Sequence, residues 1–332
     1  MNSSFHRDFF IGPMSKNVVD CVLTMNEKLD KKFGLIPSRR QIECSDLGGG
    51  YVEHWDTSRF MNRVGNTLVL RDHSGPMQGK ASDDGRLSIE SDIKSGLKFI
   101  HIDPWKCVKS IEEATQKTLE LIRFCLSIDE SCHFEVGTES AIFEYSAIDL
   151  SLFLKALKTR LSAREFETIV YAVVQSGTRV FEQRNVGVFC EASSREMCRI
   201  VHDFGLLSKE HNSDYLVNDE MLRRIECGVD SLNIAPEFGT LSSRVIVEEL
   251  AKRDTSLLAA FEDLCHKSGK WRKWTNDTSI TPRKAAILCG HYVFATHDFR
   301  LIKKEAGKCL DEAVDKKILA NLTRISQVRT ST

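Results

Sequence analysis

An aspartate and a histidine stand side by side in the stretch LVLRDHSGP, residues 68–76, where an apolar run gives way to a Gly-Pro break. Asp72 is either a polar residue that caps a strand end, or a proton-transfer group beside a metal-binding His73. The second interpretation is chemically coherent, because an imidazole binds a cation while the adjacent carboxylate accepts a proton. Which of the two applies depends on the other polar side chains that the fold brings to the same place.

Short apolar runs alternate with longer stretches of helical periodicity along the first 240 residues. Eight of these runs are predicted strands, at residues 8–14, 33–39, 66–72, 97–103, 132–138, 169–175, 204–210 and 231–237. Eight strand–helix units in one chain favour an α/β fold in which a parallel sheet closes into a (β/α)8 TIM barrel. A doubly wound open sheet is the alternative, but the only glycine cluster, LGGGY, lacks the GxGxxG spacing of a dinucleotide-binding turn.

Strand signals cease after residue 240, and the remaining stretches have helical periodicity. We therefore expect two parts, a barrel over residues 1–240 and a helical extension over residues 241–332 that packs on the barrel.

Polar side chains follow the predicted strands, which is where a (β/α)8 barrel carries its chemistry. Acids, amides, imidazoles and cations at that one end together predict a site. These residues are Ser15, Arg39, Arg40, Gln41, Asp72, His73, Asp103, Glu139, Gln175, Arg179, His211, Asp214 and Asn233. Among them, His73 and His211 each end an apolar strand and are candidate metal ligands.

Other noticeable residues have simpler interpretations. His101 and His133 lie inside strands or near strand starts, so we expect them to be core or surface histidines. Cys132 and Cys190 are expected to be core thiols. The stretch GKWRKW, residues 269–274, is expected to form a solvated face.

The composition excludes several classes of partner. Lys and Arg total 46 against 47 Asp and Glu, and the net charge is −1, so we expect neither a nucleic-acid nor a membrane partner. Eleven cysteines occur without a CxxC pair, which indicates a reducing, cytoplasmic location. The first residues contain no long apolar run, so we expect neither a signal peptide nor a membrane span. Local cations that could hold an anion are Arg39, Arg40, Arg179, Lys270 and Arg272.

The order of the motifs resembles one known family. RDHSGP is similar to the Gly-Asp-His-Leu-Gly-Pro segment of the large, often called non-catalytic, subunit of class II tagatose-1,6-bisphosphate aldolase. LGGGY precedes it as in that family, and the motifs that follow in the family's order are FIHIDPW, FEVGTE, VVQSGTRVFEQRNV, KEHNSDY and SLNIAPEFG. The resemblance covers residues 8–240, and a helical tail is also expected in that family.

This resemblance implies a zinc-dependent barrel of the class II aldolase superfamily. It implies that Asp72 handles the proton of a substrate hydroxyl and that His73 and His211 bind zinc. It further implies that Glu139 helps to deprotonate a ketose donor and that Asn233 holds substrate. The chemistry is consistent, because cleaving a carbon–carbon bond next to a carbonyl leaves an enediolate whose charge needs a Lewis acid.

One motif departs from the family. FEQRN stands where the family has Phe-Asp-His-Ser-Asn, the segment with the third zinc histidine, so Gln183 takes the histidine's place. A carboxylate beside two imidazoles is a common ligand set, which makes Glu182, or else Gln183, the third candidate ligand. A glutamate ligand would also make manganese or magnesium an alternative to zinc.

Three functions remain open. The first is a metal-dependent aldolase that acts on a sugar or sugar phosphate, and the second is a 4-epimerase that cleaves and re-adds the same bond on the other face. The third is a non-catalytic partner that stabilises a separate aldolase subunit. The retained Asp72, His73, Glu139, His211 and Asn233 favour an enzyme, whereas the missing histidine favours the partner role. The expected protein partner is a second copy of this chain or an aldolase subunit.

Overall fold

The computed structural model describes residues 5–29 and 32–328 of the 332-residue chain. Its centre is an eight-stranded sheet of parallel strands in the order β2-β1-β10-β9-β6-β5-β4-β3. Each strand overlaps one of the eight predicted runs. The strands are β1 (Phe9–Ile11), β2 (Phe33–Leu35), β3 (Arg71–Ser74), β4 (Phe99–Ile102), β5 (His133–Val136), β6 (Ile169–Val174), β9 (Leu207–Glu210) and β10 (Ser231–Ile234).

The sheet curls until its two edge strands, β2 and β3, approach each other. No continuous ladder joins these edges in the described part of the chain, but two isolated parallel bridges do, Leu35 with Val69 and Ser38 with Asp72. The Leu35 N–H also donates to the Leu68 carbonyl oxygen, 2.9 Å away. The fold is therefore barrel-like, and the expectation of a fully closed ladder is only partly met.

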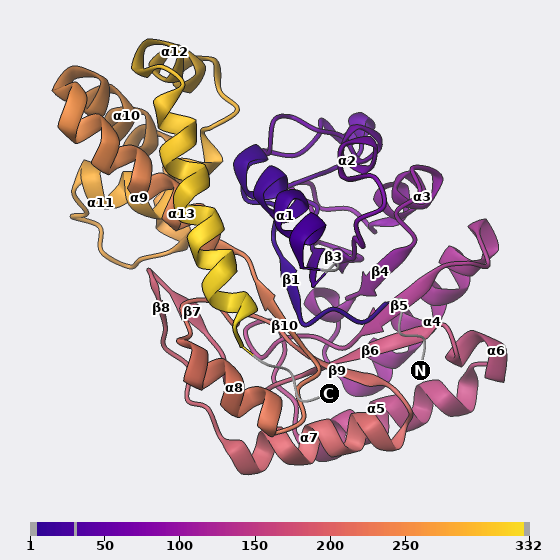
Figure 1. Ribbon diagram of the computed structural model, residues 1–332. Helices are drawn as coiled ribbons and strands as arrows, with labels where there is room; N and C mark the ends of the chain where they lie inside the picture. The colour runs from indigo at the N-terminus through magenta and orange to yellow at the C-terminus, as the bar shows by residue number, and fades with distance from the viewer. Residues whose placement is uncertain (1–4, 30–31, 329–332) are drawn as a thin grey trace.

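Helices surround the sheet (Figure 1). Those that follow the strands are α1 (Lys16–Lys28), α2 (Thr57–Val64), α3 (Arg86–Lys94), α4 (Ile111–Ile128), α5 (Ala147–Arg160), α6 (Ala163–Phe166), α7 (Glu191–Asp203) and α8 (Asn218–Glu226), with short helices η1 (Ser45–Leu47) and η2 (Trp105–Cys107). Helices α4 and α5 each begin after a serine N-cap, because the Ser110 and Ser146 hydroxyls accept main-chain N–H groups of their first turns. A small antiparallel hairpin, β7 (Val180–Phe181) and β8 (Arg184–Asn185), projects after β6.

After β10 the described chain is helical. Its elements are α9 (Pro236–Arg253), α10 (Thr255–Ser268), η3 (Lys270–Lys273), α11 (Pro282–Cys289), η4 (Gly290–Tyr292), α12 (His297–Ala306) and α13 (Cys309–Ser326). Helix α9 runs across the expected boundary at residue 240 without a break. The helices gather on one side of the sheet, and α13 returns to pack on α1 and α9 (Figure 1). None of the described helices has the length and apolarity needed to span a membrane.

The inside of the curled sheet is filled in layers, because successive side chains of a strand point to opposite faces. One layer, here called the apolar floor, is a buried cluster of Phe10, Ile36, Leu70, Phe99 and Tyr171. Polar side chains come next toward the carboxyl ends of the strands. On β9, for example, Leu207 packs against the apolar floor, whereas Lys209 and His211 follow two and four residues later.

A buried ion pair anchors the strand that carries Asp72 and His73. Arg71 of β3 and Asp92 of α3 are both fully buried, and the Arg71 Nε–H donates to Asp92 Oδ2 over 2.6 Å. The Thr57 hydroxyl donates to the other oxygen of Asp92, 2.7 Å away. This carboxylate therefore fixes the position of β3 relative to α2 and α3.

We expect Asp92→Ala to lower the free energy of unfolding by about 3–5 kcal/mol, because it leaves the Arg71 guanidinium buried without its charge partner. Urea denaturation of the variant and the wild type measures this difference. Glu130→Ala is the matched control, since Glu130 forms a solvent-exposed ion pair with Arg164. An equal effect of the two substitutions would show that the buried pair does not anchor β3.

Candidate functional site

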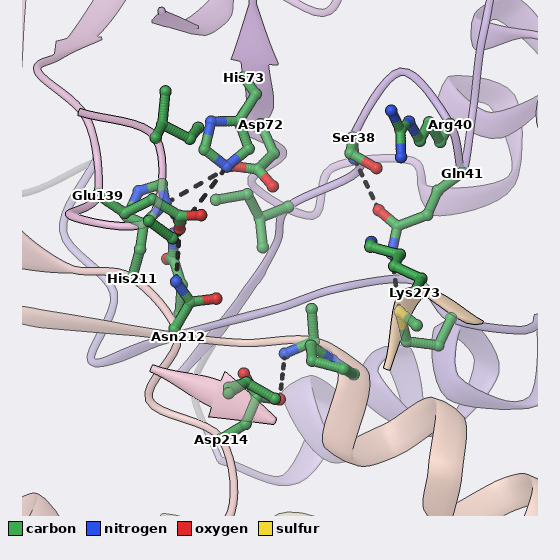
Figure 2. Close-up of a pocket in the computed structure, with 18 of the residues that line it drawn as sticks. Ser38, Arg40, Gln41, Asp72, His73, Glu139, His211, Asn212, Asp214 and Lys273 are labelled. Carbon is green, nitrogen blue, oxygen red and sulfur yellow. Dashed lines mark hydrogen bonds and ion pairs between the residues drawn. The ribbon is translucent and has the colours of Figure 1, made fainter. Parts of the chain in front are cut away.

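Three imidazoles and one carboxylate meet above the apolar floor. Asp72 and His73 come from β3, His101 from β4, and His211 directly follows β9. The three ring centroids are 5.0–5.3 Å apart, and one ligand atom from each of the four residues lies within 4.8 Å of the others. Figure 2 shows His73, Asp72 and His211 directed toward one another. We call these four residues the histidine cluster.

Two of the imidazoles are oriented by carboxylates behind them. His73 Nδ1 lies 2.5 Å from Asp103 Oδ2, and His211 Nε2 lies 2.6 Å from Glu135 Oε1. Because an ionised carboxylate can only accept, these ring nitrogens carry the protons and donate them. The opposite nitrogens, His73 Nε2 and His211 Nδ1, lie within 4 Å of Asp72 Oδ1 and can bind a cation when they carry no proton.

The third imidazole is oriented by a main-chain group. His101 Nε2 lies 2.9 Å from the Gly137 carbonyl oxygen, so this nitrogen donates, whereas Nδ1 accepts the His73 main-chain N–H, 3.3 Å away. Three ring nitrogens, His73 Nε2, His101 Nδ1 and His211 Nδ1, lie 3.5, 3.8 and 3.8 Å from Asp72 Oδ1. That oxygen is buried and has no hydrogen-bond partner. Three imidazole nitrogens around an unpartnered carboxylate oxygen fit a divalent metal ion, and His101 Nδ1 exchanges its main-chain hydrogen bond for the metal when it binds one.

The carboxylates and imidazoles in and beside the histidine cluster stabilise each other's charges. Burial by itself would raise the pKa of the Asp72 carboxyl, but the neighbouring imidazoles, His73 first, hold it below its ordinary range. Burial opposes a charge on His73 too, yet Asp72 and Asp103 raise the pKa of its imidazole to about 10. Without a metal, His73 therefore keeps a proton near neutral pH, and a binding cation must displace it.

A second carboxylate faces the cluster from the solvent side. Glu139 Oε2 lies 3.9 Å from His73 Nε2 and 3.8 Å from His211 Nδ1. The Asn212 side-chain amide donates to this oxygen over 2.6 Å (Figure 2). His73 and Asn212 both have left-handed backbones, with φ of 46° and 60°. Such strain in residues other than glycine often marks a functional site.

Asp72, His73 and His211 line a cavity of about 390 Å³, and the fully buried His101 lies behind this lining. The lining includes Asn233, which is only 6% exposed and whose two amide atoms have no hydrogen-bond partner. Four exposed cations also line the cavity, and within the described residues none of them forms an ion pair. They are Arg40, Lys106, Arg179 and Lys273. The cavity thus combines a candidate metal site, free hydrogen-bonding groups and unpaired positive charge.

Most of the predicted site residues line this cavity. They are Gln41, Asp72, His73, Glu139, Arg179, His211, Asp214 and Asn233. Two of them also have structural contacts. Gln41 Oε1 accepts the Ser38 N–H over 2.7 Å, and Asp214 Oδ1 accepts the N–H groups of Ala235 and Glu237 at the start of α9.

Four predicted substrate-binding residues lie outside the cavity lining. Ser15 caps α1 through the Val18 N–H. Arg39 is buried and its guanidinium pairs with Glu43 and Asp83. Asp103 lies behind His73, and the Gln175 amide donates to the carbonyl oxygens of Thr138 and Phe143. Each of these polar groups is satisfied by the fold, so strand-end position alone did not identify substrate contacts.

The predicted third metal ligand does not reach the histidine cluster. Glu182 is at the turn of the β7–β8 hairpin, where its carboxylate accepts hydrogen bonds from the Thr275 hydroxyl and the Lys284 ammonium, 2.8 and 2.9 Å away. Gln183 contacts Arg244. The hairpin carries both side chains away from the sheet, and His101, which we expected to be a core or surface histidine, joins the cluster instead.

Other expectations also need correction. Cys132 is buried as expected, but Cys190 is exposed. The segment GKWRKW is not simply a solvated face, because Trp271 and Trp274 are 4% and 9% exposed. Lys273 and Trp274 line the cavity, so the C-terminal helices contribute to the site. The sequence did carry a signal for His101 as a site residue. Side chains alternate between the two faces of the strand FIHID, which places His101 on the same face as Phe99.

Comparisons with known proteins show the fold. A scan against protein-family models finds no match, and no curated protein matches the sequence. Solved structures do match. The probable tagatose 6 phosphate kinase from Sinorhizobium meliloti 1021 superposes with a TM-score of 0.69 and 16% identity over 96% of this chain and 90% of that chain. The YdjI aldolase from Escherichia coli K12 gives 0.59 and 12% over 100% and 97%.

A third match is the fructuronate-tagaturonate epimerase UxaE from Cohnella laeviribosi, with a TM-score of 0.62 and 11% identity over 97% of this chain and 81% of that chain. This chain shares their fold. At these identities the likeness concerns the arrangement of the chain, so the chemistry must be argued from the cavity itself.

The geometry predicts which substitutions remove the metal. We expect His73→Ala, His101→Asn and His211→Ala each to lower bound zinc to a small fraction of the wild-type content, because each removes one converging nitrogen. Glu182→Gln should leave the zinc content unchanged. Elemental analysis of the purified, folded variants checks this. If only Glu182→Gln lost its zinc, Glu182 would be a metal ligand and the three histidines would not. A wild type that binds no metal would show that the histidine cluster is not a metal site.

Proposed function

We propose that this protein is a divalent-metal-dependent, class II aldolase-like enzyme that makes or breaks a carbon–carbon bond in a sugar or sugar phosphate. The observation that carries the proposal is the histidine cluster at the base of the cavity, in which every imidazole is oriented by an acceptor behind it. The shared fold with a solved aldolase and a solved sugar epimerase supports it. The ordered resemblance to the tagatose-bisphosphate aldolase subunit family supports it too.

His73, His101 and His211 are the residues that would hold the metal. Three imidazoles make zinc the first choice, and the position of Glu182 weakens the case for manganese or magnesium. When bound, the ion would supply a Lewis acid for the negative charge that develops beside the substrate carbonyl.

Asp72 is placed to move the proton of a substrate hydroxyl. The neighbouring imidazoles keep its carboxylate ionised, and its Oδ1 atom has no competing hydrogen bond. In the cleavage direction Asp72 takes the hydroxyl proton, the C–O bond becomes a carbonyl, and the electrons of the broken bond pass to the carbon beside the ketone. In the synthetic direction the same carboxyl returns the proton.

Glu139 is the second proton-transfer candidate. Its Oε2 atom is held by Asn212 and faces the same region as Asp72, so it can return a proton to the carbon that received the electrons. The unpartnered amide of Asn233 is available for substrate hydroxyls. The cations Arg40, Lys106, Arg179 and Lys273 are available for an anionic group such as a phosphate.

The epimerase alternative uses the same groups. A 4-epimerase must keep the aldehyde fragment in the cavity, turn it, and form the bond on its other face. The fold likeness to UxaE favours keeping this alternative.

The partner-subunit alternative rested on the missing strand-six histidine, and it is weaker now that His101 supplies a third imidazole. Size-exclusion chromatography, alone and with an aldolase subunit, tests whether either expected protein partner binds.

The reaction is tested by incubating the zinc-loaded protein with ketoses and their mono- and bisphosphates. Released aldehyde or triose phosphate identifies an aldolase, and NMR detection of a C4 epimer identifies an epimerase.

We expect Asp72→Asn, assayed at saturating zinc, to fold normally and to lose turnover by about two to four orders of magnitude, because an amide cannot accept the proton. Unchanged turnover would exclude Asp72 from the mechanism.

The rim cations lead to a separate expectation. For a phosphorylated substrate, Arg179→Gln should raise KM about tenfold or more with little effect on kcat, because a charge-assisted hydrogen bond to phosphate is lost. Arg184→Gln, in the hairpin that directly follows Arg179 but outside the cavity lining, is the matched control. Steady-state kinetics with the phosphorylated and unphosphorylated sugar separate the outcomes. An equal rise for both sugars would argue against a phosphate contact.

A further inference from the structure

A fully buried lysine, Lys209, lies beneath the histidine cluster, and the proposed reaction has no use for it. It is on β9, two residues before His211 and on the same face of the strand. Its ammonium lies 2.9 Å from Glu135 Oε2, and Glu135 is also fully buried. The centroids of the Phe10 and Tyr171 rings are 3.5 and 4.9 Å from the ammonium. This ion pair therefore separates the apolar floor from the cluster.

Lys209 has no access to a substrate. It is absent from the cavity lining, and the Phe10 and Tyr171 rings flank its ammonium from the apolar floor. A Schiff base with a sugar carbonyl is therefore excluded on steric grounds. A charge buried at this depth is costly unless it is paired, so the role of Lys209 must be sought in Glu135.

Glu135 connects the lysine to the imidazoles. Its Oε1 atom accepts the His211 Nε2 proton over 2.6 Å and lies 3.6 Å from His101 Nδ1, while Oε2 faces Lys209. A buried carboxylate this near two of the imidazoles can take one of two positions when a cation binds. It can remain behind His211 as an acceptor, or it can turn toward the cation and become a ligand.

We propose that Lys209 is a positioning residue that keeps Glu135 behind His211 and out of the metal's coordination sphere. The inference rests on the metal site proposed above. A divalent cation attracts every carboxylate in its vicinity, and in this low-dielectric interior the attraction is strong. The Lys209 ammonium, which lies beside Glu135 Oε2, opposes that attraction. It also offsets one of the negative charges that Asp72, Asp103, Glu135 and Glu139 place around the cluster.

Lys209→Met tests the lysine, because methionine keeps much of the side-chain length and removes the charge. With the ammonium gone, Glu135 is free to turn and the site is more negative by one charge. We expect the variant to bind zinc about tenfold more tightly, an effect of the size seen for groups behind metal ligands. We also expect the visible absorption of bound Co²⁺ to weaken, as an added ligand moves the ion away from tetrahedral coordination.

Glu135→Gln alone leaves the Lys209 ammonium unpaired and can fail to fold, so the carboxylate is tested in the background of Lys209→Met. The double variant Lys209→Met/Glu135→Gln keeps an amide oxygen that can accept the His211 proton, but it loses the negative charge. We expect it to bind zinc about ten- to a hundredfold more weakly than Lys209→Met. Lys98→Met is the control, since Lys98 pairs with Asp129 at the surface.

Competition titrations with a zinc chelator and Co²⁺ absorption spectra supply both readouts without any substrate. If Lys209→Met matches the wild type in zinc affinity and Co²⁺ spectrum, the positioning role is wrong and the proposed function stands. Equal affinities of Lys209→Met and the double variant would also overturn it, because the Glu135 charge would then have no effect. A folded wild type that binds neither ion overturns the metal site and this inference together.

Discussion

The site depends on one hydrogen bond behind each imidazole. A buried histidine has two ring nitrogens, and leaving either without a partner is costly. Asp103, Glu135 and the Gly137 carbonyl each satisfy one nitrogen, which determines the tautomer and turns the other nitrogen toward a shared point. The convergence is thus present in the protein without a cation. The carboxylate oxygen Asp72 Oδ1 is also buried, and its negative charge attracts a cation to the same point.

The same alternation that builds the sheet stacks these groups in order. Side chains two residues apart on a strand share a face, so Lys209 lies one layer beneath His211 and Phe99 one layer beneath His101. The eight strands were predictable because short apolar runs recur between helical stretches, as parallel strands buried on both faces require. The join between β2 and β3 was not predictable, because it depends on how far the sheet curls, and no local pattern encodes that curvature.

The site was predictable where position along a strand determines it. Asp72, His73 and His211 end apolar strands, and the structure brings them together. His101 looks like a core or surface histidine in the sequence because it lies within a strand, although its two-residue spacing from Phe99 places it on the inner face. Acceptors such as Asp103 look like substrate contacts in a sequence, because a strand-end carboxylate is polar whether it faces a cavity or a neighbouring imidazole. Distinguishing these roles requires the distances between strands.

Glu182 shows why loops resist such prediction. Its backbone has a left-handed conformation, with φ of 54°, and its N–H donates to the Trp274 carbonyl oxygen over 3.0 Å. The hairpin is therefore tied to the C-terminal helices, and this contact lies next to Lys273 and Trp274 in the cavity lining. A ligand on a strand is held more rigidly than one on a loop. The loop after β6 contributes Arg179 and Val180 to the cavity wall, and none of its residues belongs to the histidine cluster.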